Sequence, residues 1–208
     1  MNNIEVNTQS SIRLLLNKVI YFDPYKIEDS RHDADIIFIT HNHYDHFDIE
    51  SINNIKNDNT IIIAPKSMEG DIKDIVLKDY IYLNPYDEIN IDDISVKAIP
   101  AYNVGKPFHP KENNWLGYIV KYNDTTYYVA GDTDLNEDNI KVKCDIALIP
   151  IGGKYTMDVS EAAELVKTIE PKTVIPTHYG SIVGDLEDGK RLKDILSDTN
   201  IEVIEKII

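Results

Sequence analysis

Nine consecutive residues of this 208-residue chain, THNHYDHFD at positions 40–48, contain three of its six histidines and two aspartates. Imidazole and carboxylate ligands suit zinc, iron or manganese, and the absence of cysteine from this stretch argues against a structural thiolate site. In an extended chain His41, His43 and Asp45 lie on one side, and a turn can then bring His46 round to join them. The pattern predicts a metal site rather than a group of solvent-exposed histidines.

Two later stretches place one further candidate ligand each at the end of a hydrophobic run. In YYVAGDTD the run leads to Asp132, and in TVIPTHYG it leads to His178. Each motif is ambiguous by itself, because an aspartate after a glycine is common in ordinary turns. The same arrangement of strand and ligand occurs three times in the chain, and this repetition predicts that Asp132 and His178 join the first cluster.

The three motifs together resemble the metallo-β-lactamase superfamily. They are His41-x-His43-x-Asp45-His46, Gly131-Asp132-Thr133 and Pro176-Thr177-His178-Tyr179. The segments IPIGGKYTMDVSEAA and VIPTHYG are similar to its ascorbate-6-phosphate-lactonase-like branch of predicted metal-dependent hydrolases. The resemblance covers nearly the whole chain, and it implies a four-layer αββα sandwich with the site at one edge of the two sheets.

The resemblance also implies two metal ions, expected to be zinc, with iron or manganese as alternatives. By that resemblance His41 and His43 hold the first metal, and Asp132 bridges to the second. The second metal is held by Asp45, His46 and His178. Two such ions can share a water, lower its pKa towards neutrality and present hydroxide to an electrophile. Asp45 is the natural residue to orient this nucleophile, so Asp45 and Asp132 are the candidate catalytic residues.

One position departs from the family pattern. The first metal usually takes a third histidine from a loop after the middle strands, where this chain has Asn103 in IPAYN. His109, in the Gly-, Pro- and Asn-rich segment NVGKPFHPKENN, lies in a loop that could bend towards the site. His109 is therefore a candidate ligand, with an exposed loop histidine as the alternative and Asn103 or water filling the gap. His32 is expected on the surface.

The predicted function is a metal-dependent hydrolase that uses a metal-bound hydroxide on a small anionic lactone, ester or phosphoester. Lys106, Lys154 and Tyr155 are candidate substrate-binding residues, although solvated lysines and ordinary aromatic packing would explain them equally well. A second hypothesis is oxygen chemistry at a single iron, favoured by the missing third histidine. A third is a catalytically silent binding protein, which would predict a scrambled ligand set.

Hydrophobic periodicity predicts the elements that must position these residues. IIFIT at 36–40 is β-branched and aromatic, which is typical of a strand buried on both faces. Further strands are predicted at 4–8, 12–16, 18–23, 60–65, 80–83, 88–91, 94–102, 116–122, 125–132, 144–151, 172–178 and 201–208. Many antiparallel strands followed by β-α-β units predict a mixed α/β domain with sheets and helices packed outside them.

Four helices are predicted, two of them from capping signals. Asp48 is expected to cap one helix and Asp158, with Glu161 three residues on, to cap another; the others are a weak helix at 67–76 and one at 188–198. Ile49, Ile52 and Ile55 are expected to lie on one face of the first helix, and Leu192, Ile195 and Leu196 are expected to face inward in the last.

Length, cysteine content and net charge limit the domain number, compartment and partners that we expect. The length fits one domain over residues 1–208, and the single cysteine, Cys144, excludes an internal disulfide and favours a reducing compartment. The N-terminus lacks the basic and apolar parts of a signal peptide, and no apolar run approaches a membrane span. We therefore expect a cytoplasmic protein that does not bind membranes.

The net charge of −15 disfavours nucleic acid as a partner and leaves a small-molecule substrate. Oligomerisation stays open.

Overall fold

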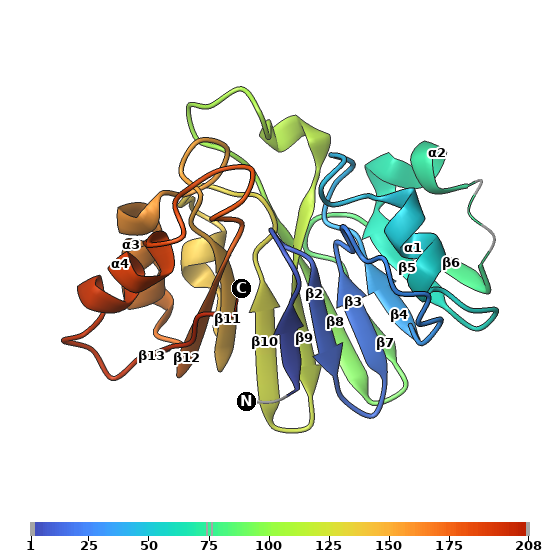
Figure 1. Ribbon diagram of the computed structural model, residues 1–208. Helices are drawn as coiled ribbons and strands as arrows, with labels where there is room; N and C mark the ends of the chain where they lie inside the picture. Colours follow the sequence, from blue (N-terminus) through green and yellow to red (C-terminus); the bar gives the residue numbers. More distant parts are fainter. Residues whose placement is uncertain (1–2, 74, 76, 207–208) are drawn as a thin grey trace.

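The computed structural model describes residues 3–206 except 74 and 76, and its strands form two sheets (Figure 1). Across the first sheet the order is β1 (Ile4–Val6), β2 (Ile12–Leu15), β3 (Val19–Phe22), β4 (Ile36–Phe38), β5 (Ile61–Pro65) and β6 (Asp79–Leu83). Across the second it is β13 (Glu202–Val203), β12 (Thr173–Thr177), β11 (Ile146–Pro150), β10 (Thr125–Val129), β9 (Leu116–Tyr122), β8 (Ile94–Pro100) and β7 (Glu88–Ile91).

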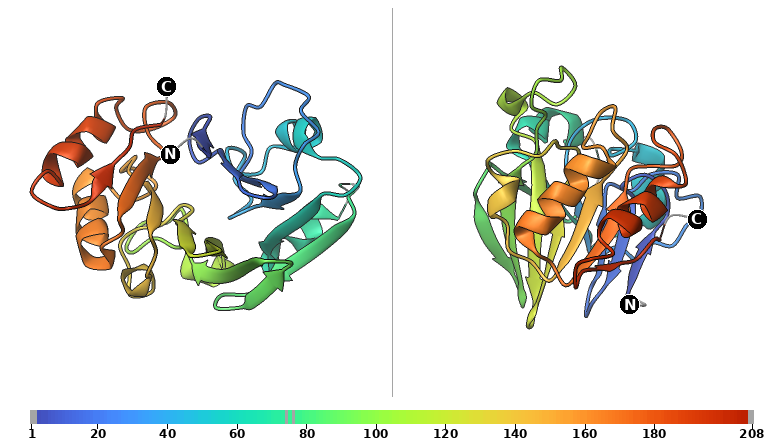
Figure 2. Two further views of the ribbon diagram at one scale, coloured as in Figure 1. Left: turned by 90° about the horizontal axis from the view of Figure 1, so that it is seen from below. Right: turned by 90° about the vertical axis from the view of Figure 1, so that its left-hand side faces the viewer.

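The helices lie outside the two sheets, as the views in Figures 1 and 2 show. Helices α1 (Ile49–Ile55) and α2 (Glu69–Ile72) lie on one side, and α3 (Val159–Ile169) and α4 (Asp188–Ile195) on the other. Three short 3-10 turns, η1 (Lys66–Met68), η2 (Lys111–Asn113) and η3 (Asn139–Lys141), complete the elements. Among the residues described, no helix combines the length and apolar character that a membrane crossing requires.

Alternation along the strands builds the four layers, because successive side chains point to opposite faces of a sheet. In β4, Ile36 and Phe38 face the core between the sheets, where the Phe38 ring lies 4.9 Å from that of Tyr118. Ile37 faces the other way, into a second core that also contains Ile52 of α1. A third core lies between the second sheet and helices α3 and α4. The predicted four-layer αββα sandwich of mixed α/β class is confirmed.

Strand direction brings several loops to one edge of the sandwich. Strands β10, β11 and β12 run parallel, and β8 runs with them because both β8 and β10 are antiparallel to β9. The end of β4 joins this edge through two hydrogen bonds to β9: Leu116 N–H donates to Thr40 O (3.1 Å) and the Tyr118 hydroxyl to Ile39 O (2.7 Å). The segments that follow β4, β8, β10 and β12 therefore converge.

Both predicted helix caps are present. The Asp48 carboxylate accepts hydrogen bonds from the backbone N–H groups of Glu50 and Ser51 at the start of α1. At α3, Asp158 accepts from Glu161 N–H while the Glu161 side chain accepts from Asp158 N–H, each at 2.9 Å. These bonds satisfy donors that have no partner within the helix.

Most of the predicted elements that differ are shorter in the structure by a few residues at their ends, and two differ more. The helix expected over 67–76 is one 3-10 turn and the four-residue α2, which contains the weak helix former Gly70, and positions 74 and 76 lie outside the described residues. The strand expected over 201–208 is the two-residue edge strand β13, with a further hydrogen bond from Ile204 N–H to Val174 O (3.0 Å), and positions 207–208 are not described.

Two isoleucines do not lie with the helix residues that they were expected to join. Ile49 is 43% exposed. Each step of three residues falls about 60° short of a full helical turn, so after two such steps Ile49 and the buried Ile55 lie on different sides of the helix. Ile195 is 40% exposed at the end of α4, whereas Leu192 and Leu196, four residues apart, are buried. The predictions that Ile49 shares the face of Ile52 and Ile55 and that Ile195 faces inward were wrong.

Candidate metal centre

The loop after β4 carries four of the candidate ligands. His46 N–H and Phe47 N–H both donate to the carbonyl of His43, at 3.0 and 2.9 Å. This tight turn brings the His46 ring to 4.0 Å from that of His41, measured between centroids. Tyr44, the residue inside the turn, points its side chain outward and is 64% exposed. The local geometry thus gathers His41, His43, Asp45 and His46 as the sequence pattern predicts.

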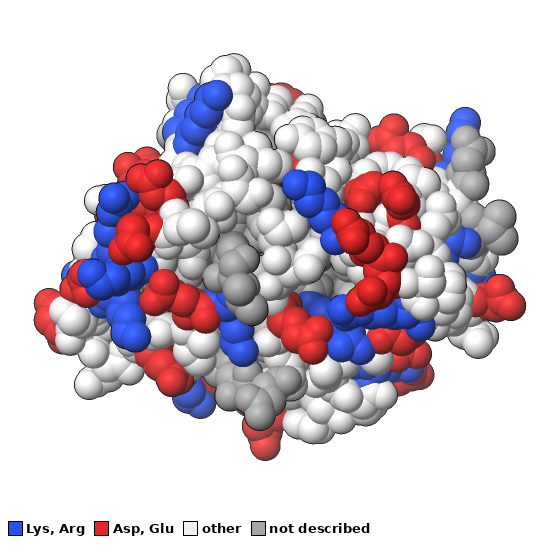
Figure 3. Space-filling model, in the orientation of Figure 1, with Lys and Arg blue, Asp and Glu red and all other residues white. Residues whose placement is uncertain are grey.

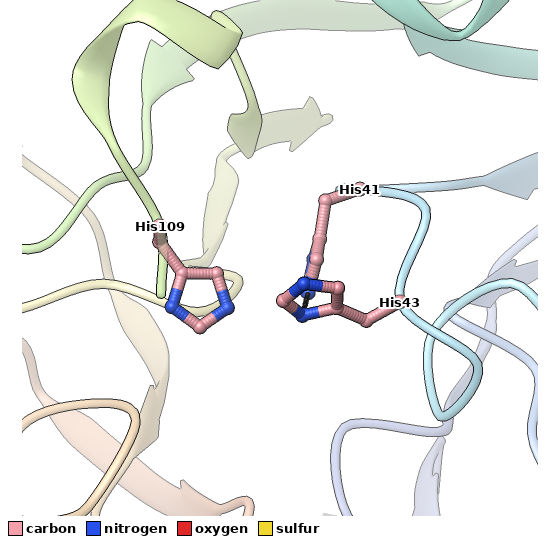
Figure 4. Close-up of side chains that lie close together, drawn as sticks. All are labelled: His41, His43 and His109. Carbon is pink, nitrogen blue, oxygen red and sulfur yellow. Dashed lines mark hydrogen bonds between the residues drawn. The ribbon is translucent and has the colours of Figure 1, made fainter. Parts of the chain in front are cut away.

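His109 completes a cluster with two of these residues. One nitrogen each of His41, His43 and His109 lies within 4.8 Å of the other two. The rings point toward one another from two loops, and Nε2 of His41 lies 3.0 Å from Nδ1 of His43 (Figure 4). His109 is buried, and its Nδ1 lies 2.9 Å from Oδ1 of Asn103. The structure therefore places His109 in the cluster and Asn103 behind it.

A second cluster lies beside the first. It is formed by Asp45, His46 and His178, whose ligand atoms also lie within 4.8 Å of one another. Nε2 of His178 lies 3.3 Å from Oδ2 of Asp45, and Nε2 of His46 lies 3.7 Å from the same oxygen. His178 follows β12, so the second cluster joins the two sheets.

Asp132 lies between the two clusters. Its Oδ1 is 3.3 Å from Nε2 of His46, and its Oδ2 is 3.3 Å from Nε2 of His109 and 3.2 Å from Nε2 of His178. Gly131 turns the chain at the end of β10 with a positive φ of 66°, a conformation that favours glycine. One carboxylate thus reaches histidines of both clusters, which is the position required of a bridging ligand.

Asp23 is a supporting residue that the sequence analysis missed. It is fully buried; its Oδ2 lies 2.8 Å from Nδ1 of His46 and accepts a 2.7 Å hydrogen bond from the Thr40 hydroxyl. That hydroxyl oxygen lies 2.9 Å from Nδ1 of His41. Partners of this kind fix the orientation of ring nitrogens that bind metals. The signal was available, since Asp23 ends the apolar run KVIYFD just as Asp132 ends its own.

The shifted pKa values of the buried histidines and aspartates favour cation binding at the cluster. Burial, with the positive charge of His46, holds the pKa of His41 well below its usual range, which keeps that ring available as a ligand. Burial alone would raise the pKa of Asp132, but His178, His46 and His109 together lower it far below its usual value. Burial opposes protonation of His46, yet Asp132 and Asp23 raise its pKa well above the ordinary value. The buried carboxylates thus attract positive charge.

Four side-chain atoms support a fit to metal ions. Within the described part of the chain, these buried atoms have no hydrogen-bond partner: Nε2 of His46, His109 and His178, and Oδ1 of Asp132. Buried polar atoms without partners are costly and uncommon in folded proteins. Cations bound between the two clusters would satisfy all four. The nitrogen and oxygen donor set suits zinc, iron or manganese.

A cavity of about 220 Å³ opens onto this cluster. Its walls are His43, Tyr44, Asp45, Phe108, His109, Asp132, Tyr155, His178 and Ile182. A larger cavity of about 360 Å³, lined in part by Arg13 and Arg31, contains none of the seven candidate ligands. The smaller cavity is therefore the one that adjoins the candidate metal ligands.

The three candidate substrate-binding residues occupy different places. Tyr155 lines the cavity. The Lys106 ammonium donates to Asp134 (2.7 Å) and to the backbone carbonyl of Thr156 (2.8 Å), and Lys106 is not among the lining residues. The Lys154 ammonium lies over the Tyr155 ring, 4.9 Å from its centroid, also outside the lining. His32 is exposed and away from the cluster.

Comparison with known proteins gives the family. Residues 10–178 match the profile of the β-lactamase superfamily domain. A UPF0173 metal-dependent hydrolase of Pyrococcus horikoshii is 34% identical over 201 residues, covering 85% of each chain. The crystal structure of a proposed metal-dependent hydrolase from Parabacteroides distasonis matches with a TM-score of 0.85 and 31% identity, over 99% of this chain and 93% of that one.

A more distant structure shares the fold alone. The diiron β-hydroxylase CmlA from Streptomyces venezuelae is 14% identical, with a TM-score of 0.74 over 97% of this chain and 52% of that one. The resemblance to the ascorbate-6-phosphate-lactonase-like branch stays a prediction, whereas the superfamily is confirmed. The chain belongs to the metallo-β-lactamase superfamily, among its UPF0173 metal-dependent hydrolases.

Proposed function

We propose that this metal-dependent hydrolase cleaves a lactone, ester or phosphoester bond in a small molecule, with two zinc ions as cofactor. The observation that carries the proposal is the position of Asp132, whose carboxylate reaches His46, His109 and His178. His41, His43 and His109 would hold one ion, and Asp45, His46 and His178 the other, with Asp132 shared. Ions in these positions would lower the pKa of a shared water and polarise the bond under attack.

Asp45 is the residue we assign to orient the attacking water. It lines the cavity, and its carboxylate lies within 3.3 Å of His178 Nε2. Burial opposes its ionisation, but its close contact with the His178 ring and the charge of His46 hold its pKa below the usual value. An ionised carboxylate at the cavity wall can accept a hydrogen bond from water and aim its lone pair at the substrate.

Four observations weigh against other functions. Cys144 does not line the cavity, and burial raises the pKa of its thiol to about 12, so a cysteine nucleophile has no support. The one-iron hypothesis depended on a missing third histidine, and His109 lies beside His41 and His43. A catalytically silent binding protein would be expected to have scattered ligand residues, whereas the candidate ligands here lie in neighbouring clusters. On the face in Figure 3, Lys and Arg are interspersed with Asp and Glu, which offers a polyanion no basic patch.

Metal removal tests the proposal directly. Dialysis against a chelator should abolish turnover of lactones, esters or phosphoesters, and adding back zinc should restore it. Asp132→Ala should also abolish turnover, because both ions lose a ligand. Metal analysis of the purified protein should find two zinc ions per chain. Turnover that survives complete demetallation would overturn the proposal, and one iron per chain with oxygen uptake would favour the oxygenase hypothesis.

A further inference from the structure

The walls of the 220 Å³ cavity are of two kinds. Five lining residues are candidate metal ligands, and the other four are the large apolar or aromatic side chains Tyr44, Phe108, Tyr155 and Ile182. Among the described residues that line it, none is Lys or Arg. Small-molecule sites have mostly apolar walls with a few polar groups that fix orientation. Here the polar groups are those of the metal centre, and the remaining wall is apolar.

The apolar wall is attached to the metal centre by the chain itself. Tyr44 lies between the ligands His43 and Asp45, and Phe108 directly precedes His109. Phe108 packs edge-on against Tyr155, with ring centroids 4.7 Å apart and planes at 89°. Tyr44, Phe108 and Ile182 are nevertheless 64%, 38% and 37% exposed. This wall therefore presents uncovered apolar surface at a fixed place beside the reacting centre.

Two of the three nearby lysines are paired with acidic side chains, and the third lies outside the cavity lining. The Lys106 ammonium contacts Asp134 and two backbone carbonyls, and the Lys111 ammonium contacts Glu137 and Asp138. Lys154 lies over the Tyr155 ring. A substrate carboxylate or phosphate placed against the apolar wall would lose water without gaining a cation, which is costly.

We infer that the cavity selects a small uncharged substrate whose aryl or short alkyl group lies against Tyr44, Phe108, Tyr155 and Ile182. This inference rests on the proposed function and replaces the expected anionic substrate with a neutral lactone or ester. Burial of an apolar group contributes about 25 cal/mol per Å². The cavity is smaller than the roughly 300–1,000 Å³ of typical drug-sized sites, so the substrate is small.

Binding of three hydroxamic acids to the zinc-loaded protein tests the inference without requiring turnover. Calorimetry should show that benzohydroxamic acid binds about tenfold more tightly than acetohydroxamic acid, and that succinic monohydroxamic acid gains nothing over acetohydroxamic acid. Phe108→Ala should remove most of the benzohydroxamic advantage and leave acetohydroxamic binding unchanged. Val104→Ala is the matched control, since Val104 is 59% exposed in the same loop and does not line the cavity.

Two results would overturn the inference. One is tighter binding of succinic monohydroxamic acid than of benzohydroxamic acid, particularly if Lys154→Ala abolishes that difference. The other is faster hydrolysis of phenyl phosphate than of phenyl acetate or an alkyl γ-lactone, which would leave the hydrolase proposal intact. Conversely, preferential benzohydroxamic binding with no hydrolysis of any substrate would overturn the proposed function and leave the cavity preference standing.

Discussion

At the scale of single residues, His109 is the proposed ligand whose role the sequence left open. Nε2 of His109 lies 3.3 Å from Oδ2 of Asp132, and the ring belongs to the cluster with His41 and His43. His109→Ala should lower the zinc content from two ions towards one, because the first ion would keep only two histidines and the bridging carboxylate. Metal analysis after dialysis measures this.

The exposed His32 provides the control for that substitution. His32→Ala removes an imidazole outside the cluster and should leave two ions bound. If His109→Ala also keeps two tightly held ions, His109 is not a required ligand, and Asn103 or water takes its place.

Asp23 would act one contact away from the proposed ions, through His46 and Thr40. Asp23→Asn replaces the carboxylate at 2.8 Å from Nδ1 of His46 by an amide, which holds that ring less firmly. Loss of such a partner typically lowers metal affinity about 10–100-fold. Competition with a chelator of known affinity should show this loss, with Asp124→Asn, an exposed aspartate, as the control. Equal affinity in the two variants would contradict the assigned role.

At the scale of elements, the site depends on two neighbouring loops, after β11 and after β12. A Cβ added to Gly152 would overlap the backbone carbonyl of His178 and the Val183 side chain. Gly152→Ala should therefore push the two loops apart, lower the melting temperature and release the zinc ion that we propose His178 helps to hold.

Gly70→Ala is the matched control for this substitution. A Cβ at Gly70, within α2, meets no atom within 4 Å. Alanine there should stabilise the protein by about 0.5–1 kcal/mol through its higher helix propensity, with full zinc content. Full zinc content in Gly152→Ala would show that close approach of these loops is not needed.

At the scale of the whole molecule, Asp138 ties together segments far apart in the sequence. Its carboxylate accepts hydrogen bonds from the hydroxyls of Tyr86 (2.9 Å) and Tyr102 (3.0 Å) and from the Lys111 ammonium (3.2 Å). Burial would raise the pKa of Asp138, but its bonds with Tyr86, Lys111 and Tyr102 hold that pKa below the usual value. The carboxylate therefore stabilises the fold only while it is ionised.

Asp138→Asn should lower the free energy of unfolding at pH 7 by about 1–2 kcal/mol, since these hydrogen bonds involve a charged group. The unfolded carboxyl titrates near 3.9 and the folded one below it, so this stabilisation is complete above that pH. It is lost as the pH falls through the lowered folded pKa. Urea unfolding of both proteins from pH 7 to 3 should show the difference shrinking with acidity, and a constant difference would contradict it.

The sequence by itself determined the fold class, both helix caps and the ligand-bearing loop after β4. These features are local: alternation along a strand, a capping aspartate and the spacing of His41, His43, Asp45 and His46 act between residues within a few positions of one another. The same locality explains the failures at Ile49 and Ile195, where burial depends on what packs against the helix rather than on helical spacing alone.

Only the tertiary structure decided how distant segments meet. It placed His109 in the cluster and Asn103 behind it, brought Asp23 to His46, and engaged Lys106 with Asp134. It also placed Ile182 beside Phe108 and Tyr155 in one cavity wall. Each outcome depends on the order and direction of strands across two sheets, which bring loops together across long stretches of chain, and no spacing along the sequence encodes those distances.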